Sequence, residues 1–269
     1  MTTFDDLCSS DTKRLLDTIR EGTARLRGMA QSIDIRWDPT TPDPRKLHNN
    51  YARNLVACYS TKMADLSEAA LLALQSLNYL VYALCGRAML ETVATLHYYV
   101  THEYARLLAK PSIDSDGLRK LVELDDQHLR GTRFDWESLL AGDYSTLMRD
   151  ARARRQQRGN KGSSSNAKRP TTAKPVRIGD CIDRWAEEHD GVRVVYELLC
   201  DLVHPNMGSN LLVASIDSHD LYFTKHKGRP VGHTIFEQTL PLIVSVTHKP
   251  FGDDLVRLMA TIWHDDELH

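Results

Sequence analysis

The sequence lacks the short motifs that mark several large enzyme classes. It has neither G-x-x-x-x-G-K-[ST] nor G-x-G-x-x-G, so the usual phosphate-binding loops are not expected, and it has no G-x-S-x-G nucleophile elbow. H-E-x-x-H and Glu-x-x-His are absent too, which argues against a zinc peptidase and a di-iron bundle. Two isolated pairs, Asp125-x-x-His128 and Asp201-x-x-His204, do not complete a ligand set. We therefore expect no metal and no cofactor.

Cysteine is scarce and scattered. The chain has five cysteines and no C-x-x-C pair, which argues against both a zinc ribbon and a disulfide framework. Cys58, Cys85 and Cys200 lie in apolar segments that are expected to be helical. We interpret them as buried thiols that act as small apolar side chains.

No apolar run is long enough and clean enough to span a bilayer. The most apolar window, residues 69–90, contains Gln75, Ser76, Asn78 and Arg87, so it predicts a buried helix. The N-terminal MTTFDDLCSS is acidic and lacks the apolar core of a secretory signal. The formal net charge of −2 gives no global attraction to nucleic acid or acidic membranes. We therefore expect a cytoplasmic protein.

Apolar residues recur at helical spacing along most of the chain, which predicts an all-α bundle. Ser9 and Ser10 precede a helix that is expected to end near residue 31, and Asp43-Pro44 is typical of the start of a second helix. The proline-free stretch 66–110 predicts either one long helix or two that join near Gly86, and the unbroken apolar stripe favours one helix that continues past Gly86. Further helices are expected at about 114–131, 180–204, 233–247 and 252–264, and the second helix should bury Leu47, Tyr51, Leu55 and Cys58.

Two segments do not fit a helix. LLVASID and LYFTKHK predict a small β-hairpin near residues 211–226, after a turn at PNMGSN. Residues 158–176 have almost no large apolar side chains and predict a mobile basic insertion within a single domain, 1–269. The basic run from Arg149 to Arg177 is suited to nucleic-acid phosphates, or it is a solvated linker.

Arg87 and Glu91 are charged residues on a helical stripe that is otherwise apolar. Because an unpaired buried charge is very costly, they must pair with each other or line a cavity. In the first case they form a structural ion pair that fixes the helix register, or they lie on a locally solvated face. In the second, Arg87 binds an anion and Glu91 orients it.

A second polar group lies near the end of the predicted 180–204 helix. Arg193, Glu197, Asp201 and His204 share one face, and His204 lies at the negative end of the helix dipole. A histidine there, before Pro205, suits proton transfer or phosphate contact, whereas the alternative is a solvated face that ends in a cap. Our candidate catalytic residues are therefore His204, Arg87 and Glu91, and our candidate binding residues are Asp201, Asn206, Arg193 and Tyr98.

Two stretches, CGRAMLETVATLHYYV at 85–100 and VYELLCDLVHPNMGSN at 195–210, resemble uncharacterised bacterial all-helical proteins of the HEPN-like kind. They cover about an eighth of the chain. Some relatives in that group are ribonuclease toxins or abortive-infection proteins. The resemblance implies a helical fold and a pocket shared by Arg87, Glu91 and His204.

HEPN ribonucleases carry an arginine followed by a histidine with four to six residues between them, at a composite site between two protomers. This chain has that spacing at Arg184…His189 and Arg257…His264. Composition alone predicts about three such matches, and neither of the two includes His204.

Three functions remain open. The chain is a helical binding or regulatory module in bacterial stress or phage defence, a metal-independent ribonuclease that uses Arg87 and His204, or a structural scaffold. The candidate partners are a second copy of the chain, RNA or a small anionic ligand, and no membrane.

Overall fold

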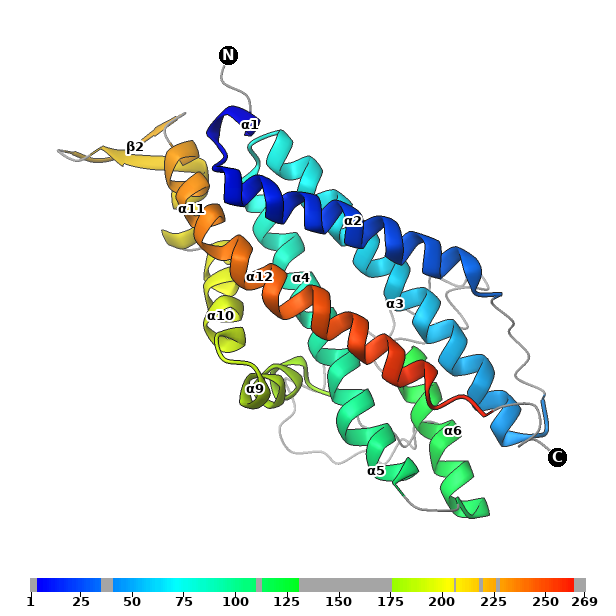
Figure 1. Ribbon diagram of the computed structural model, residues 1–269. Coiled ribbons are helices and arrows are strands. Elements are labelled where there is room, and N and C mark those ends of the chain that lie inside the picture. Colours follow the sequence, from blue (N-terminus) through cyan, green and yellow to red (C-terminus); the bar gives the residue numbers. More distant parts are fainter. Residues whose placement is uncertain are drawn as a thin grey trace, which may run out of the picture.

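Long helices packed side by side form the body of the protein, and the predicted all-α class is confirmed (Figure 1). The computed structural model describes residues 4–34, 41–109, 113–130, 176–205, 207–217, 220–225 and 228–263. In chain order, the helices are α1 (Phe4–Leu7), α2 (Ser10–Ser32), α3 (Pro44–Gln75), α4 (Tyr79–Tyr98), the π-helical segment η1 (Tyr99–Tyr104), α5 (Ala105–Leu108), α6 (Ser115–Arg130), α9 (Ile178–Glu188), α10 (Val192–Val203), α11 (Met207–Val213) and α12 (Gly228–Met259).

The body is built from α2, α3, α4 and α12, with α3 running opposite to the other three (Figure 1). Helix α6 packs on α3, whereas α9 and α10 pack on α4. The core between these helices consists of fully buried leucines and aromatic residues, among them Leu16, Leu55, Leu90, Trp185 and Phe236. None of the helices in the described part of the chain is both long and apolar enough to cross a membrane.

The predicted starts of the first two long helices are confirmed. The Ser9 side chain accepts a hydrogen bond from the backbone N–H of Thr12, and the Asp43 side chain accepts one from the N–H of Arg45. Both bonds satisfy amides that the first turn leaves unpaired. Pro44 stands at the first helical position, where its missing N–H costs nothing.

The prediction of a single helix over 66–110 is wrong in its first part. Helix α3 continues to Gln75, and the chain turns at Leu77, whose φ is 55°. The N–H of Asn78 bonds back to the carbonyl of Ala73 at 2.7 Å, and the Asn78 side chain caps α4. From there the helix does continue through Gly86, where an added Cβ would lie 3.3 Å from Leu199.

Three further boundaries differ from the predictions. The 180–204 segment is two helices, because Gly191 takes a φ of 88° and ends the run between α9 and α10. Residues from Met207 begin α11, where a turn was predicted. The two helices predicted at the end are one, α12, which holds Pro241 and Pro250 inside it. Each proline removes one helical hydrogen bond, but the packing of α12 on α2 and α4 keeps the helix whole.

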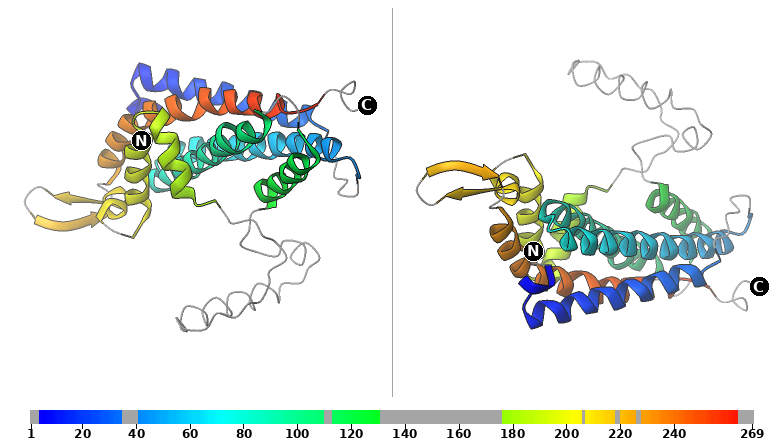
Figure 2. Two further views of the ribbon diagram at one scale, coloured as in Figure 1. Left: turned by 90° about the horizontal axis from the view of Figure 1, so that it is seen from below. Right: turned by 90° about the horizontal axis from the view of Figure 1, so that it is seen from above.

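The predicted thiol burial holds for Cys85 but not for Cys58, which is exposed, or Cys200, which is half-buried. Strands β1 (Ala214–Asp217) and β2 (Asp220–Lys225) pair antiparallel, with Ser215 opposite Thr224, and project from the helices (Figure 2). The chain is still helical at 211–213, so the pairing begins later than the sequence predicts. Of the expected mobile insertion at 158–176, all but Val176 lies outside the described residues.

Candidate ligand-binding groove

Arg87 and Glu91 are paired, and a tyrosine from α10 joins them. Arg87 Nε donates to Glu91 Oε1 at 3.0 Å, and the Tyr196 hydroxyl donates to the same oxygen at 3.1 Å. The Arg87 guanidinium also lies 5.9 Å from the centre of the Tyr196 ring, a cation–π distance. About 30% of each charged side chain stays exposed, 29% for Arg87 and 31% for Glu91, so the pair lies at the edge of the α4–α10 contact.

A similar Arg–Tyr–Glu arrangement recurs further along the same face of α4. The Arg184 guanidinium, from α9, lies 5.7 Å from the centre of the Tyr98 ring, and the Tyr98 hydroxyl donates to Glu103 Oε1 at 2.8 Å. Tyr98 and Glu103 are five residues apart, a spacing that an ordinary α-helix turns to different sides. The wider π-helical turns of η1 bring them together.

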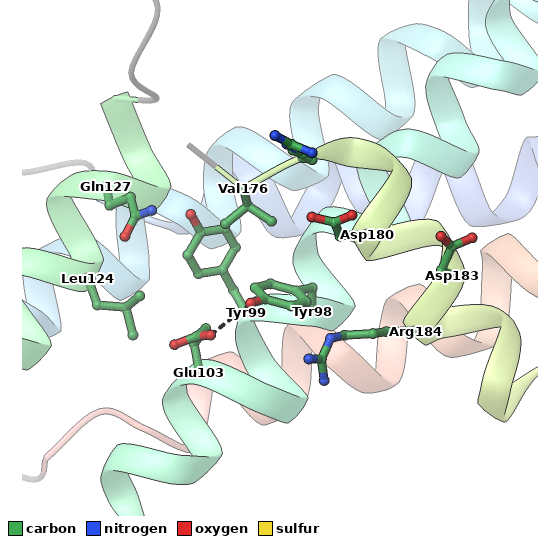
Figure 3. Close-up of a pocket in the computed structure, with 10 residues that line it drawn as sticks. Tyr98, Tyr99, Glu103, Leu124, Gln127, Val176, Asp180, Asp183 and Arg184 are labelled. Carbon is green, nitrogen blue, oxygen red and sulfur yellow. Dashed lines mark hydrogen bonds between the residues drawn. The ribbon is translucent and has the colours of Figure 1, made fainter. Parts of the chain in front are cut away.

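Tyr98 opens onto a groove of about 890 Å³ between η1, α6 and α9. Figure 3 shows the rings of Tyr98 and Tyr99 between Leu124 and Gln127 of α6 on one side and Asp180 and Arg184 of α9 on the other. This volume is typical of small-molecule sites. π-Helical turns are also found frequently at functional sites, which marks this groove as a candidate.

Two guanidinium groups in the groove keep their charge available. Within the described residues, neither Arg177 nor Arg184 has a carboxylate at ion-pair distance, although both line the groove. Of the lining carboxylates, Glu103 pairs with Arg106 at 2.9 Å, and Asp183 pairs with Arg193.

Among the lining carboxylates, Asp180 is left without an ion pair inside the described segments. Counted over the described residues alone, two arginines and one aspartate of the groove are thus without an ion pair. Burial and the bond to Glu103 raise the pKa of Tyr98 to about 12, so its phenol stays neutral and its ring offers a stacking face.

His97, one residue before Tyr98, turns toward α12. Its Nδ1 lies 2.9 Å from Asp254 Oδ2 and its Nε2 lies 3.2 Å from Glu188 Oε2. Burial lowers the pKa of His97, but the bonds and charges of Asp254 and Glu188 outweigh burial and raise it above its ordinary value. The buried ring is thus a pH-sensitive link between α4, α9 and α12.

A buried polar network lies behind Tyr99. His128 stacks on the Tyr99 ring at 3.8 Å and accepts or donates a bond with the Tyr59 hydroxyl at 2.7 Å. The Tyr104 hydroxyl donates to Asp125 Oδ1 at 2.8 Å.

The other oxygen of Asp125 completes the network. Asp125 Oδ2 lies 2.8 Å from His48 Nδ1, and His48 Nε2 lies 2.9 Å from the Thr261 hydroxyl. These groups hold η1, α3, α6 and the turn that follows α12 together behind Tyr99. Burial lowers the pKa of His128 to about 3, which keeps that ring neutral.

The residues predicted near the end of α10 lie apart from this groove. His204 is exposed and ends α10 with extended backbone, as expected before Pro205, and no hydrogen bond or ion pair joins it to Arg87 or Glu91 among the residues described. Asp201 is exposed, and Asn206 lies outside the described residues. Arg193 reaches the groove only through its pairing with Asp183.

Tyr98 was a predicted binding residue, whereas the groove residues Tyr99, Glu103, Asp180 and Arg177 were not predicted. The tyrosines and the aspartate come from segments about 80 residues apart, so no local motif could link them. The described residues contain no group of three or more histidine, cysteine, aspartate or glutamate side chains placed to hold a metal ion. No protein-family profile, no curated protein and no solved structure matches the chain.

Proposed function

We propose that the chain is a helical binding protein whose groove between η1, α6 and α9 takes a small planar anion, a nucleotide unit either free or within single-stranded RNA. The observation that supports this is the pair of guanidinium groups, Arg177 and Arg184, which line the groove beside the half-buried ring of Tyr98. Guanidinium groups bind phosphate through paired N–H donors, and tyrosine faces stack on bases of any sequence. A groove of about 890 Å³ has room for both parts of a nucleotide.

The proposal is tested by calorimetric titration of the full chain with AMP, adenosine and inorganic phosphate. AMP should bind more tightly than either part alone, because it uses the cations and the rings together. Arg184→Gln should weaken AMP binding about 10- to 100-fold, the value of a charge-assisted bond. Arg119→Gln is the matched control, since Arg119 is an exposed arginine on α6 outside the groove and the substitution removes the same charge.

Variants of Tyr98 test the contribution of ring stacking to AMP binding separately from that of charge. Tyr98→Ala should weaken AMP binding about 5- to 100-fold through lost stacking, whereas Tyr98→Phe keeps the ring and should bind within about twofold of the wild type. A ten-nucleotide oligoadenylate distinguishes a free nucleotide from RNA as the ligand. No binding of AMP or the oligomer, or equal binding by wild type and Arg184→Gln, would end the proposal.

A regulatory role in bacterial stress or phage defence is the setting that the HEPN-like resemblance implies for such a binding protein. Metal-independent ribonuclease activity is the second candidate. It is favoured by the position of Arg184 in the groove, because His189 follows it at the spacing of HEPN ribonucleases and lies at the end of the same helix.

Incubation of total RNA with the wild type, Arg184→Gln and His189→Ala tests this candidate. Cleavage by the wild type that both substitutions abolish would establish it. Arg87→Ala and His204→Ala belong in the same assay. If cleavage were lost only in these two variants, the catalytic residues would be the ones predicted from the sequence. Unchanged RNA in all samples, together with no AMP binding, leaves the scaffold reading, in which the Arg87–Glu91 pair sets how α10 packs on α4.

A further inference from the structure

A second cavity lies on another side of the molecule, between α2, α3 and the last third of α12. These helices lie against one another in Figures 1 and 2, where α2 is blue and this part of α12 is red. The cavity has a volume of about 430 Å³, and its walls are mainly apolar. Its apolar walls include Leu26, Met29, Met63, Phe251 and Leu255.

One nitrogen of His248 is a hydrogen-bond acceptor at the wall of this cavity. The Thr247 hydroxyl donates its one hydrogen to the carbonyl of Ile243 at 2.5 Å, so toward His248 Nδ1, 3.2 Å away, it can only accept. Nδ1 therefore carries the ring proton. Nε2 keeps its lone pair and has no hydrogen-bond partner in the described residues. Burial lowers the pKa of His248, which keeps the ring in this neutral form.

A glycine on α2 lets the His248 ring reach the cavity wall. A Cβ at Gly22 would lie 3.0 Å from His248 Cδ2 and 3.3 Å from Nε2, and both residues line the cavity. The position of Nε2 is thus fixed from both sides, by Thr247 at the far nitrogen and by the α2 backbone at the near edge.

The rim of the cavity shows no preference for either charge. Glu21 and Asp253 carry negative charges there, and Arg25 and Lys249 carry positive ones. Glu21 and Arg25 pair with each other at 3.4 Å. A ligand therefore gains nothing from a net charge, but it gains from apolar area and from one donor placed against Nε2.

We propose that this cavity binds a neutral, mainly apolar small molecule that donates one hydrogen bond, from a hydroxyl or a ring N–H, to His248 Nε2. The cavity volume suits a molecule of about two fused rings, the apolar side chains enclose its body, and the fixed tautomer selects a donor over an acceptor. This site is separate from the groove at η1 and does not depend on the function proposed for that groove.

The test uses two probes of similar shape, 2-naphthol and 2-methoxynaphthalene. The first has a hydroxyl donor, and in the second that donor is methylated. Titration of the full chain should give about tenfold tighter binding of 2-naphthol, the fold-change expected for one hydrogen bond. No detectable binding of either probe, or equal binding of both, would overturn the proposal.

Two variants assign the preference to the ring. His248→Phe keeps an aromatic side chain but has no acceptor, so it should bind both probes equally, and a preference that survives in it would refute the role of Nε2. Thr247→Val removes the hydroxyl that fixes the tautomer, so it should reduce the preference for 2-naphthol. Nitrogen NMR of the histidine rings reports directly whether His248 carries its proton on Nδ1 in the wild type, and a proton on Nε2 would contradict the proposal.

Discussion

Removing the Asp125 carboxylate should cost a large part of the protein's stability. Asp125 is fully buried and accepts two bonds of 2.8 Å, one from the Tyr104 hydroxyl and one from His48 Nδ1. In Asp125→Ala both donors would stay buried without a partner, at a cost of about 1–3 kcal/mol each. With the small void left by the lost carboxylate, we expect a loss of about 3–5 kcal/mol in the free energy of unfolding.

Asp125→Asn separates the loss of hydrogen bonds from the loss of charge. The amide oxygen can still accept from Tyr104, and the amide nitrogen can donate to His48 Nδ1 when the ring carries its proton on Nε2 alone. The Thr261 hydroxyl, which donates to the carbonyl of Leu258, can accept from that Nε2. We therefore expect this variant to lose about 1–2 kcal/mol, clearly less than the alanine variant.

Urea unfolding followed by circular dichroism and by tryptophan fluorescence measures these differences, provided that both probes give the same transition. For a chain of this length, the alanine variant should also melt about 5–9 °C lower. Glu123→Ala is the control on the same helix, because Glu123 is exposed and its ion pair with Arg119 is exposed too, so the substitution should change stability by less than about 0.5 kcal/mol. A loss of under about 1 kcal/mol in Asp125→Ala would show that the buried network does not hold α3, α6 and η1 together.

Three further changes test other parts of the fold. The raised pKa of His97 means that the folded state binds its proton more tightly, so this contribution to stability is present below about pH 6.5 and is lost as the pH rises through the raised value. The buried rings of His128 and His248, whose pKa values are lowered, contribute in the opposite direction. Raising the pH from 6 to 8 should therefore change the free energy of unfolding less favourably in the wild type than in His97→Gln, as measured by urea unfolding, and the same change in both would contradict the role of His97. Gly191→Ala should lower the free energy of unfolding by about 1–2 kcal/mol, because the left-handed backbone at this position disfavours a Cβ. Gly28→Ala, in open space on α2, should instead raise it by about 0.5–1 kcal/mol. Equal changes in the two variants would refute this comparison. Gly232→Ala places a Cβ 2.4 Å from Tyr79 Cδ2 and should cost about 1–3 kcal/mol, so an unchanged melting temperature would show that this contact between α4 and α12 is loose.

Most helices could be predicted from the sequence because their signals are local. The spacing of apolar residues and the caps at Ser9 and Asp43 lie within one or two turns of the helices they define. The break at Leu77 could not be predicted in this way, since a left-handed leucine carries none of the glycine or proline signals on which such a prediction depends. Pro250 is a typical helix-breaking signal, and it led to the wrong prediction of two helices where there is one. Tertiary packing on α12 outweighs the hydrogen bond that the proline removes.

The candidate site was less accessible to sequence reasoning. The Arg87–Glu91 pair is local, at helical i, i+4 spacing, and was found. The groove brings η1 and α9 together across a long stretch of chain, and which carboxylates lie near Arg184 depends on the folded surface. His248 gave no signal either, because its tautomer depends on which carbonyl the neighbouring hydroxyl reaches.

The π-helical segment shifts the angular phase of the long helix that contains it. A turn that takes in an extra residue rotates everything after it by about 100° relative to what came before. Tyr98 lines the groove, whereas Tyr104, six residues further along the same continuous helix, is fully buried against Asp125. Deletion of one residue within 99–104 would remove this rotation. The residues that line the groove and the buried residues behind them would then no longer face their present partners.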